Sequence, residues 1–177
     1  VWMVMPLIAS GDLWTQMKHR KFNRVDSVMI VHDCWLALQF LHKRVGLLHL
    51  DIKPSNLLFQ GDRIYIIDFS LWERWPVPAG RQLHQLYCTE GFRPPELQPR
   101  PWGQDKTQAQ LRSVVIPAVD IWTLGVVAAL LAWSTLAEPA ERPQMRPREW
   151  GCTTVRNRRL DRVSPVGSFL RPALDIY

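Results

Sequence analysis

The chain has 177 residues, of which 47% are hydrophobic and 21% charged, a composition typical of a globular domain that excludes a disordered or collagen-like chain. Its 22 Lys+Arg against 16 Asp+Glu give a formal charge of +6, which suits phosphate-bearing partners, acidic proteins or nucleic acid without choosing among them. Its three cysteines stand far apart and form no CxxC pair, so neither a disulfide framework nor a zinc site is predicted.

The N-terminal residues predict a strand, a tether and the start of a helix. Residues 1–5 form an apolar, β-type run that Pro6 ends, and residues 9–12 carry the Gly and Asp of a turn followed by a helix start. The run has no initiator Met and no basic segment before it. We therefore expect the interior of a longer sequence rather than a secretory signal.

Residues 25–43 predict one amphipathic helix. Apolar side chains recur there at helical spacing. Asp26 or Ser27 would cap its start, and Gly46 would end it.

Two short apolar runs, residues 57–59 and 64–67, predict a β-hairpin. The Gln60-Gly61-Asp62 segment that joins them suits a tight turn. One aspartate lies just beyond each end of the pair, Asp51 before it and Asp68 after it.

The longest apolar stretch, residues 121–137, predicts a buried core helix. It falls short of the roughly 20 residues that a membrane span requires, so we expect no membrane partner. From residue 138 onward Pro and Arg dominate and no helical or strand period remains. This Arg-rich end suits either a nucleic-acid or nuclear-import patch or a solvated tail. We favour the tail and expect no nucleic-acid partner.

One loop concentrates groups that carry chemistry. The segment His49-Leu50-Asp51-Ile52-Lys53-Pro54-Ser55-Asn56 contains a carboxylate, an ammonium and an amide, and Asp68 follows the hairpin. Phosphoryl transfer needs hard oxygen ligands for a metal-bound triphosphate, a carboxylate to orient the attacking hydroxyl and a cation to offset charge. Asn56 and Asp68 can supply the ligands, Asp51 the carboxylate and Lys53 the cation. The sequence therefore predicts a phosphoryl-transfer site.

The same residues resemble the motifs of protein kinases. Residues 49–56 resemble the catalytic loop H-R-D-L-x-x-x-N, and Asp68-Phe69-Ser70 resembles the metal-binding D-F-G. Residues 89–96, Thr-Glu-Gly-Phe-Arg-Pro-Pro-Glu, resemble the end of a kinase activation segment, T-x-x-Y-R-A-P-E. Residues 120–125 resemble the D-x-W-x-x-G that opens the central helix of the large lobe. These motifs follow the order of the family over residues 1–135.

The resemblance implies a role for each catalytic-loop residue. Asp51 would be the catalytic base and Lys53 the phosphate-side cation, while Asn56 and Asp68 would be the Mg²⁺ ligands. Thr89 would face the base from the substrate segment. ATP and Mg²⁺ are the implied cofactors. Proteins with Ser or Thr hydroxyls are the implied substrates, because Lys53 with Thr89 resembles serine/threonine rather than tyrosine kinases.

Three further residues would be structural. His49 would bond to local backbone, and Asp120 would accept hydrogen bonds from the backbone of the catalytic loop. Glu96 would pair with a late arginine, for which Arg142 and Arg159 are the candidates.

Around the adenine ring the resemblance implies Met5 as gatekeeper and Leu58 as floor. A kinase hinge offers adenine the carbonyl of the first residue after the gatekeeper and both backbone groups of the third, here Pro6 and Ile8. Proline lacks an N–H, but its position needs only the carbonyl. Asp12 falls where an acidic side chain can meet the ribose or a basic substrate side chain.

Some positions depart from the family pattern. Leu50 replaces the arginine of H-R-D, so no guanidinium stands beside the base to receive a phosphate. Residues 71–88 contain Tyr87 as their only hydroxyl-bearing residue. We therefore expect activity that does not depend on phosphorylation of this segment. Ser70 in place of glycine would restrict reorientation of its motif.

H-L-D, D-F-S and F-R-P-P-E together look most like the serine/threonine kinases of herpesviruses. On that likeness the protein would act inside a host cell, in the nucleus or cytoplasm, and in the virion tegument.

We therefore expect a mainly helical α+β fold, the large C-terminal lobe of a protein kinase with its hinge. The Gly-rich loop, strand lysine and helix glutamate of the family would precede residue 1, so the small lobe is absent from these 177 residues. The expected function is serine/threonine phosphorylation by a partial chain, and the alternative is a catalytically inactive kinase fragment or pseudokinase that binds another protein. The expected divisions are residues 1–13 (last small-lobe strand and hinge), 14–137 (large lobe, with catalytic loop 49–56, metal motif 68–70, activation segment 68–96 and central helix 120–137) and 138–177 (basic Pro/Arg-rich region).

Overall fold

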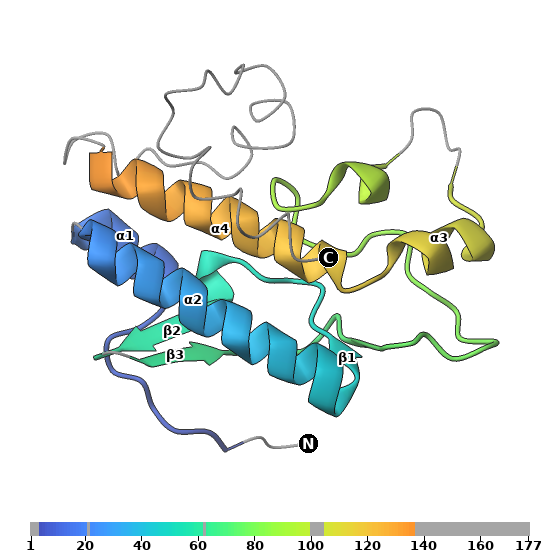
Figure 1. Ribbon diagram of the computed structural model, residues 1–177, viewed down its shortest axis with the longest axis horizontal. Coiled ribbons are helices and arrows are strands. Elements are labelled where there is room, and N and C mark those ends of the chain that lie inside the picture. Colours follow the sequence, from blue (N-terminus) through green and yellow to red (C-terminus); the bar gives the residue numbers. More distant parts are fainter. Residues whose placement is uncertain (1–3, 21, 62, 100–104, 137–177) are drawn as a thin grey trace.

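The fold is mainly helical, with two small antiparallel sheets. The computed structural model describes residues 4–20, 22–61, 63–99 and 105–136. Helices α2 and α4 lie side by side and run in opposite directions, and the β2–β3 hairpin packs against α2 (Figure 1). The described helices are α1 (Leu13–His19), α2 (Arg24–Phe40), α3 (Gln108–Val114) and α4 (Ala118–Leu136); the strands are β1 (Leu47–Leu48), β2 (Leu57–Gln60), β3 (Arg63–Ile66) and β4 (Glu73–Arg74).

Polar side chains set where the first two helices begin. Asp12 caps α1 by accepting a hydrogen bond from the Thr15 amide at 2.8 Å. The cap of α2 is Asn23, whose side chain accepts from the Asp26 amide at 2.8 Å. The prediction of Asp26 or Ser27 as this cap was therefore wrong, because the extended backbone of Asn23 lies one turn earlier. The predicted stop is confirmed: a π-helical turn follows α2 and ends at Gly46, whose φ is 70°.

The predicted hairpin is confirmed, with strand limits shifted by one residue. β2 and β3 pair from Leu57↔Ile66 to Gln60↔Arg63, and Gly61 adopts a φ of 65° in the turn. The predicted strand at residues 1–5 is not found in its described part. Val4 and Met5 form no strand and are 97% and 54% exposed, because no described segment offers them a pairing edge.

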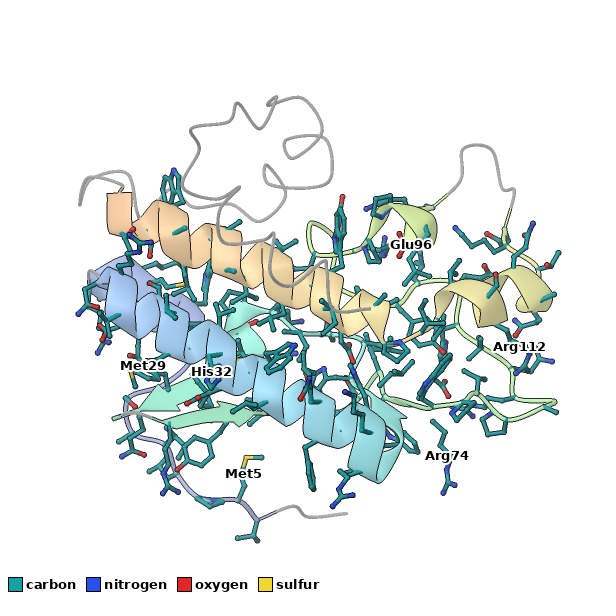
Figure 2. All side chains as sticks on the ribbon, in the orientation of Figure 1. Met5, Met29, His32, Arg74, Glu96 and Arg112 are labelled. Carbon is teal, nitrogen blue, oxygen red and sulfur yellow. The ribbon has the colours of Figure 1, made fainter. Side chains whose placement is uncertain are left out.

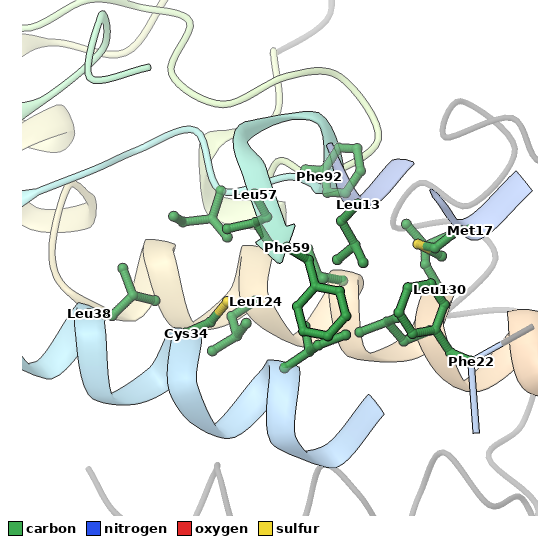
Figure 3. Close-up of a cluster of buried hydrophobic side chains, with 14 residues drawn as sticks. Leu13, Met17, Phe22, Cys34, Leu38, Leu57, Phe59, Phe92, Leu124 and Leu130 are labelled. Carbon is green, nitrogen blue, oxygen red and sulfur yellow. The ribbon is translucent and has the colours of Figure 1, made fainter. Parts of the chain in front are cut away.

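The main core lies between α2, α4 and the hairpin (Figure 3). Buried side chains of α4, among them Leu124 and Leu130, meet Cys34 and Leu38 of α2 and Phe59 of β2. The prediction of a buried helix is confirmed, although it begins at Ala118 rather than Asp120. Residues 118–135 are long and apolar enough to cross a membrane, yet half of them are buried inside the fold. Each large apolar side chain in such a core contributes about 1.5–3 kcal/mol.

A second cluster of buried side chains lies around the catalytic loop and α3. It includes Leu50, Tyr87 and Leu111. Helix α3 was not predicted, although its start carries a capping box in which Thr107 and Gln110 bond reciprocally at 3.0 and 3.2 Å. Strands β1 and β4 were also missed, because two-residue strands carry no readable period.

The structure describes two of the three cysteines and none of the C-terminal basic region. Cys34 and Cys88 are free and buried. Cys152 and the basic region 138–177 lie outside the described residues.

Candidate active site

A buried carboxylate holds the catalytic loop from beneath. Asp120, in the first turn of α4, is 0% exposed. Its oxygens accept hydrogen bonds from the amides of His49 at 2.8 Å and Leu50 at 2.7 Å, and His42 Nε2 lies 2.8 Å away. Hydrogen bonds to a charged group contribute more than those between neutral groups. The loop is therefore fixed just before Asp51.

His49 joins the catalytic loop to the segment that carries Asp68. Its Nδ1 accepts from the Asp51 amide at 3.2 Å, which leaves Nε2–H to donate to the Ile67 carbonyl at 3.1 Å. The ring also packs on Phe69, with 4.7 Å between centroids. Burial lowers the pKa of His49 despite the nearby carboxylates, so the ring stays neutral and serves as a structural link.

Asp51, Lys53 and Thr89 form a closed set of contacts. Lys53 Nζ lies 2.7 Å from Asp51 Oδ2 and 2.8 Å from Thr89 Oγ1. The amide and hydroxyl of Thr89 both donate to Asp51 Oδ1, at 2.9 and 2.8 Å. Burial alone would raise the pKa of Asp51, but the hydrogen bonds from Lys53 and Thr89 and the charge of Lys53 hold it below its ordinary value. Asp51 is therefore ionised at neutral pH.

Asn56 lies beside this set and leads toward Asp68. Its Nδ2 donates to the Asp51 carbonyl at 2.9 Å and to Asp51 Oδ2 at 3.2 Å. Its backbone carbonyl accepts from Ile67 at 3.0 Å, one residue before Asp68. Asp68 is exposed, with a φ of 63°, and its Oδ1 accepts from the Ser70 amide at 3.3 Å. The left-handed residue of this motif is thus Asp68, where an aspartate is tolerated, and Ser70 has no positive φ.

The oxygen atoms of Asn56 and Asp68 fit a magnesium ion by their chemistry. Asn56 Nδ2 is used by Asp51, which leaves the amide oxygen for another partner, and the exposed Asp68 carboxylate is within reach of solvent. In the described chain no group of three or more His, Cys, Asp or Glu side chains lies together. Such a pair is the kind of site where Mg²⁺ is held with substrate phosphates and water rather than by a full protein cage.

The residues expected around adenine lie along the hairpin. Asp12 and Leu58 form an isolated antiparallel bridge, which places the end of the segment expected to be the hinge beside β2. The carbonyl of Ile8 accepts from the Gly11 amide at 3.1 Å, so a turn engages one of its two hinge groups. Met5 and Pro6 are exposed, and Figure 2 shows Met5 on the segment that passes beneath the hairpin.

Asp12 caps the start of α1, which confirms the helix start predicted at residues 9–12. Its two carboxylate oxygens accept from the Thr15 amide at 2.8 Å and from Thr15 Oγ1 at 3.1 Å. A role toward ribose or a basic side chain stays a prediction.

A small pocket opens next to the Asp51 contacts. It encloses about 240 Å³ and is lined by Trp14, Lys53, Ser55, Thr89 and Phe92. Pockets for small molecules usually enclose about 300–1,000 Å³, so this one has the size for a single side chain rather than a nucleotide.

Two further findings concern Glu96 and Arg93. Glu96 is exposed on the short helix Pro95–Leu97 (Figure 2), and its candidate partners Arg142 and Arg159 lie outside the described residues. Sequence reasoning missed Arg93, which is buried and donates to the carbonyls of Tyr87 at 2.7 Å and Cys88 at 2.9 Å. A charged residue in an apolar, proline-rich stretch was the available signal.

Comparison with known proteins shows what the chain is similar to. The family model of the protein kinase domain matches residues 1–149. The chain is 30% identical over 137 residues to calcium/calmodulin-dependent protein kinase type 1B of Homo sapiens, covering 74% of this chain and 35% of that protein. It is 27% identical over 135 residues to ribosomal protein S6 kinase alpha-4 of Homo sapiens, covering 73% and 16%. It is 28% identical over 147 residues to an Aurora kinase of Yarrowia lipolytica, covering 81% and 34%. The chain thus spans about a third or less of the length of these relatives.

Proposed function

The chain belongs to the protein kinase domain family, and we propose that it carries the phosphoryl-transfer centre of a serine/threonine protein kinase. One observation carries this proposal. The Asp51 carboxylate is held at once by the ammonium of Lys53 and by the amide and hydroxyl of Thr89. A pocket lined in part by Lys53 and Thr89 opens beside the Asp51 carboxylate and has room for one substrate side chain.

Each residue of this set has a task in the proposed reaction. Asp51, kept ionised by its low pKa, accepts a hydrogen bond from the substrate hydroxyl and takes its proton as the new oxygen–phosphorus bond forms. Lys53 offsets negative charge on the transferring group. Thr89 holds the Asp51 carboxylate in one orientation through two hydrogen bonds.

Asn56 and Asp68 would bind Mg²⁺ with ATP, the cofactors that the family uses. When bound, Mg²⁺–ATP would supply the γ-phosphoryl group, and ADP would leave as the bond between the γ-phosphorus and its bridging oxygen breaks. Asn56 presents its amide oxygen because Asp51 engages its nitrogen, and this contact fixes the orientation of the amide.

A specific observation favours a second candidate, a kinase-like module that binds another protein without catalysis. Val4, Met5 and Leu7 are 97%, 54% and 90% exposed on the segment where the adenine site is expected. Apolar side chains so exposed are typical of a surface that another protein or domain covers.

Two measurements test the proposal. The first is titration of the chain with ATP at increasing Mg²⁺, which should show Mg²⁺-dependent affinity in the parent protein and its loss in Asp68→Asn. The second is phosphate transfer to a serine-rich protein, in which Asp51→Asn should lower kcat by about 10²–10⁴ while leaving the fold nearly unchanged. Asp105→Asn, at an exposed aspartate, is the matched control.

The outcomes separate the two candidates. Equal transfer rates for the parent and Asp51→Asn would remove Asp51 from its catalytic role. Absence of any nucleotide binding and transfer would favour the protein-binding module.

We also propose a narrower assignment within the protein kinase family. The motifs H-L-D, D-F-S and F-R-P-P-E support a likeness to herpesvirus serine/threonine kinases and hence action inside a host cell. The relatives reported above are cellular kinases. A coding sequence flanked by host rather than viral genes would contradict this assignment.

A further inference from the structure

The single hydroxyl side chain of residues 71–88 is sealed inside the protein. Tyr87 is 0% exposed, its hydroxyl donates to Glu73 Oε1 at 2.8 Å, and it accepts from the His84 amide at 3.2 Å. Burial, the hydrogen bond to Glu73 and its charge raise the pKa of Tyr87 to about 12, so the hydroxyl stays protonated and keeps donating. This tyrosine is a structural tie rather than an accessible site for modification.

The partner of Tyr87 is a buried, fully engaged carboxylate. Glu73 lies in β4 and is 2% exposed. Arg81 binds it through two parallel hydrogen bonds, Nε to Oε2 at 2.9 Å and Nη2 to Oε1 at 3.0 Å. A buried carboxylate requires such pairing, because an unpaired charge in the interior is costly. The fork of Arg81 and the hydroxyl of Tyr87 together satisfy it.

The segment around Arg81 is docked on α3. Arg112 donates to the carbonyls of Pro78, at 2.7 Å, and of Arg81. The side chain of Gln108 exchanges two hydrogen bonds with the backbone of Leu83, at 2.8 and 3.1 Å. The loop that supplies Arg81 is therefore held in place from its other side.

The contacts of Tyr87 continue directly to the catalytic carboxylate. Arg93 bonds the carbonyls of Tyr87 and Cys88, and the Cys88 amide donates to the Leu50 carbonyl at 3.0 Å. The next residue is Thr89, whose amide and hydroxyl contact Asp51. Glu73 is also tied to the catalytic loop through β4, which pairs with β1 just before that loop.

Many kinases order this segment by phosphorylation, through new pairs between the phosphate and arginine side chains. We propose that Glu73, Arg81 and Tyr87 together form a permanent clamp, which orders this segment in place of a phosphate. They act as positioning residues that hold Thr89 against Asp51 without any modification of residues 71–88. The effect of the clamp on catalysis rests on the proposed kinase function, whereas the ordering of Thr89 by the clamp does not.

Hydrogen exchange of the whole, phosphatase-treated chain without nucleotide tests the clamp. The readouts are the amides of Cys88 and Thr89, compared with the amide of Val127 in the core of α4. Arg81→Gln should speed exchange at the first two by at least about tenfold and leave Val127 unchanged. Arg74→Gln is the matched control, because Arg74 is exposed and points away from the body of the protein (Figure 2).

A second pair of variants covers the case in which Arg81→Gln does not fold. Tyr87→Phe keeps the buried ring and removes only the hydroxyl, so exchange at Thr89 should rise several-fold. Tyr65→Phe, at a tyrosine 39% exposed on β3, should match the parent. A uniform rise that includes Val127 in either clamp variant would show general destabilisation and overturn the proposal.

Two other results would also overturn it. One is equal exchange at Thr89 in the clamp variants and their controls. The other is exchange at the Cys88 and Thr89 amides of the unphosphorylated parent as fast as in an unfolded chain. Since no step of this experiment needs ATP or catalysis, failure of the kinase proposal would leave the exchange result decisive for the clamp.

Discussion

Replacing Asp120 by Ala removes the acceptor that holds the catalytic loop, and the structure gives the size of the loss. The Asp120 carboxylate is 0% exposed and accepts from the amides of His49 and Leu50. Without it, two buried N–H groups have lost their acceptor, each at a cost of about 1–3 kcal/mol. His42 also loses its contact at 2.8 Å. We expect the free energy of unfolding to fall by roughly 2–6 kcal/mol.

Asp120→Asn should cost about half as much. The amide oxygen can still accept from one backbone N–H, but the NH₂ group then faces a second donor. Urea unfolding followed by circular dichroism measures both losses. With a urea dependence of about 2 kcal/mol per molar, a loss of 4 kcal/mol lowers the midpoint by about 2 M.

Asp105→Ala is the matched control, because Asp105 is exposed and should change the midpoint little. Hydrogen exchange at the Leu50 amide should rise in Asp120→Ala beyond the change expected from global stability. A midpoint for Asp120→Ala within error of Asp105→Ala would refute the reasoning, since it would mean that water or other groups replace the carboxylate at no cost.

Three further predictions follow from single residues of the site and its supports. Gly46→Ala should lower the free energy of unfolding by about 1–2 kcal/mol or more, because the φ of Gly46 is 70° and a Cβ would lie 3.1 Å from the Trp75 carbonyl oxygen. Gly61→Ala should cost less, because Gly61 has a φ of 65° but open space around the added Cβ. Equal urea midpoints for the two variants would contradict this prediction. The pKa of Asp51 is lower in the folded protein than in the unfolded chain, so its contribution to stability is present above about pH 4 and is lost as the pH falls through the folded value. The free energy of unfolding, measured against pH, should therefore fall less steeply below pH 4 in Asp51→Asn than in the parent. Parallel curves for the two proteins would be evidence against the ion pair. Leu50→Arg places a guanidinium where the Leu50 side chain is 0% exposed, so the free energy of unfolding, measured by thermal unfolding, should fall by several kcal/mol. An unchanged Tm would show that a charge is tolerated beside Asp51.

Features set by neighbouring residues could be read from the sequence. Helix α2, the Gly46 stop and the β2–β3 turn depend on groups a few residues apart, and all three are present. The apolar face expected of α2 is found only in part, because Ile30 and Leu38 are buried but Val28 is 43% exposed. The start of α2 was misplaced because several residues near it can cap a helix, and only the backbone conformation of Asn23 decides among them.

The order of the motifs along the chain indicated which groups belong to the site, and the residues of the catalytic loop are close in sequence. Asp51, Lys53 and Asn56 could therefore be expected to contact one another, and they do. The metal ligation expected of Asn56 and Asp68 stays a prediction. Their oxygens have the right chemistry, and binding itself is a property of the loaded protein.

Packing alone decided the contacts that join distant parts of the chain. Asp120 reaches His49 across 71 residues, and Thr89 reaches Asp51 across 38. The pairing of Glu73 with Arg81 and Tyr87 left no periodic trace, because a buried ion pair imposes no spacing on the sequence. Local patterns determine helices and turns through hydrogen bonds within a few residues. Buried polar contacts such as these form only when the folded chain excludes water and brings their partners within hydrogen-bonding distance.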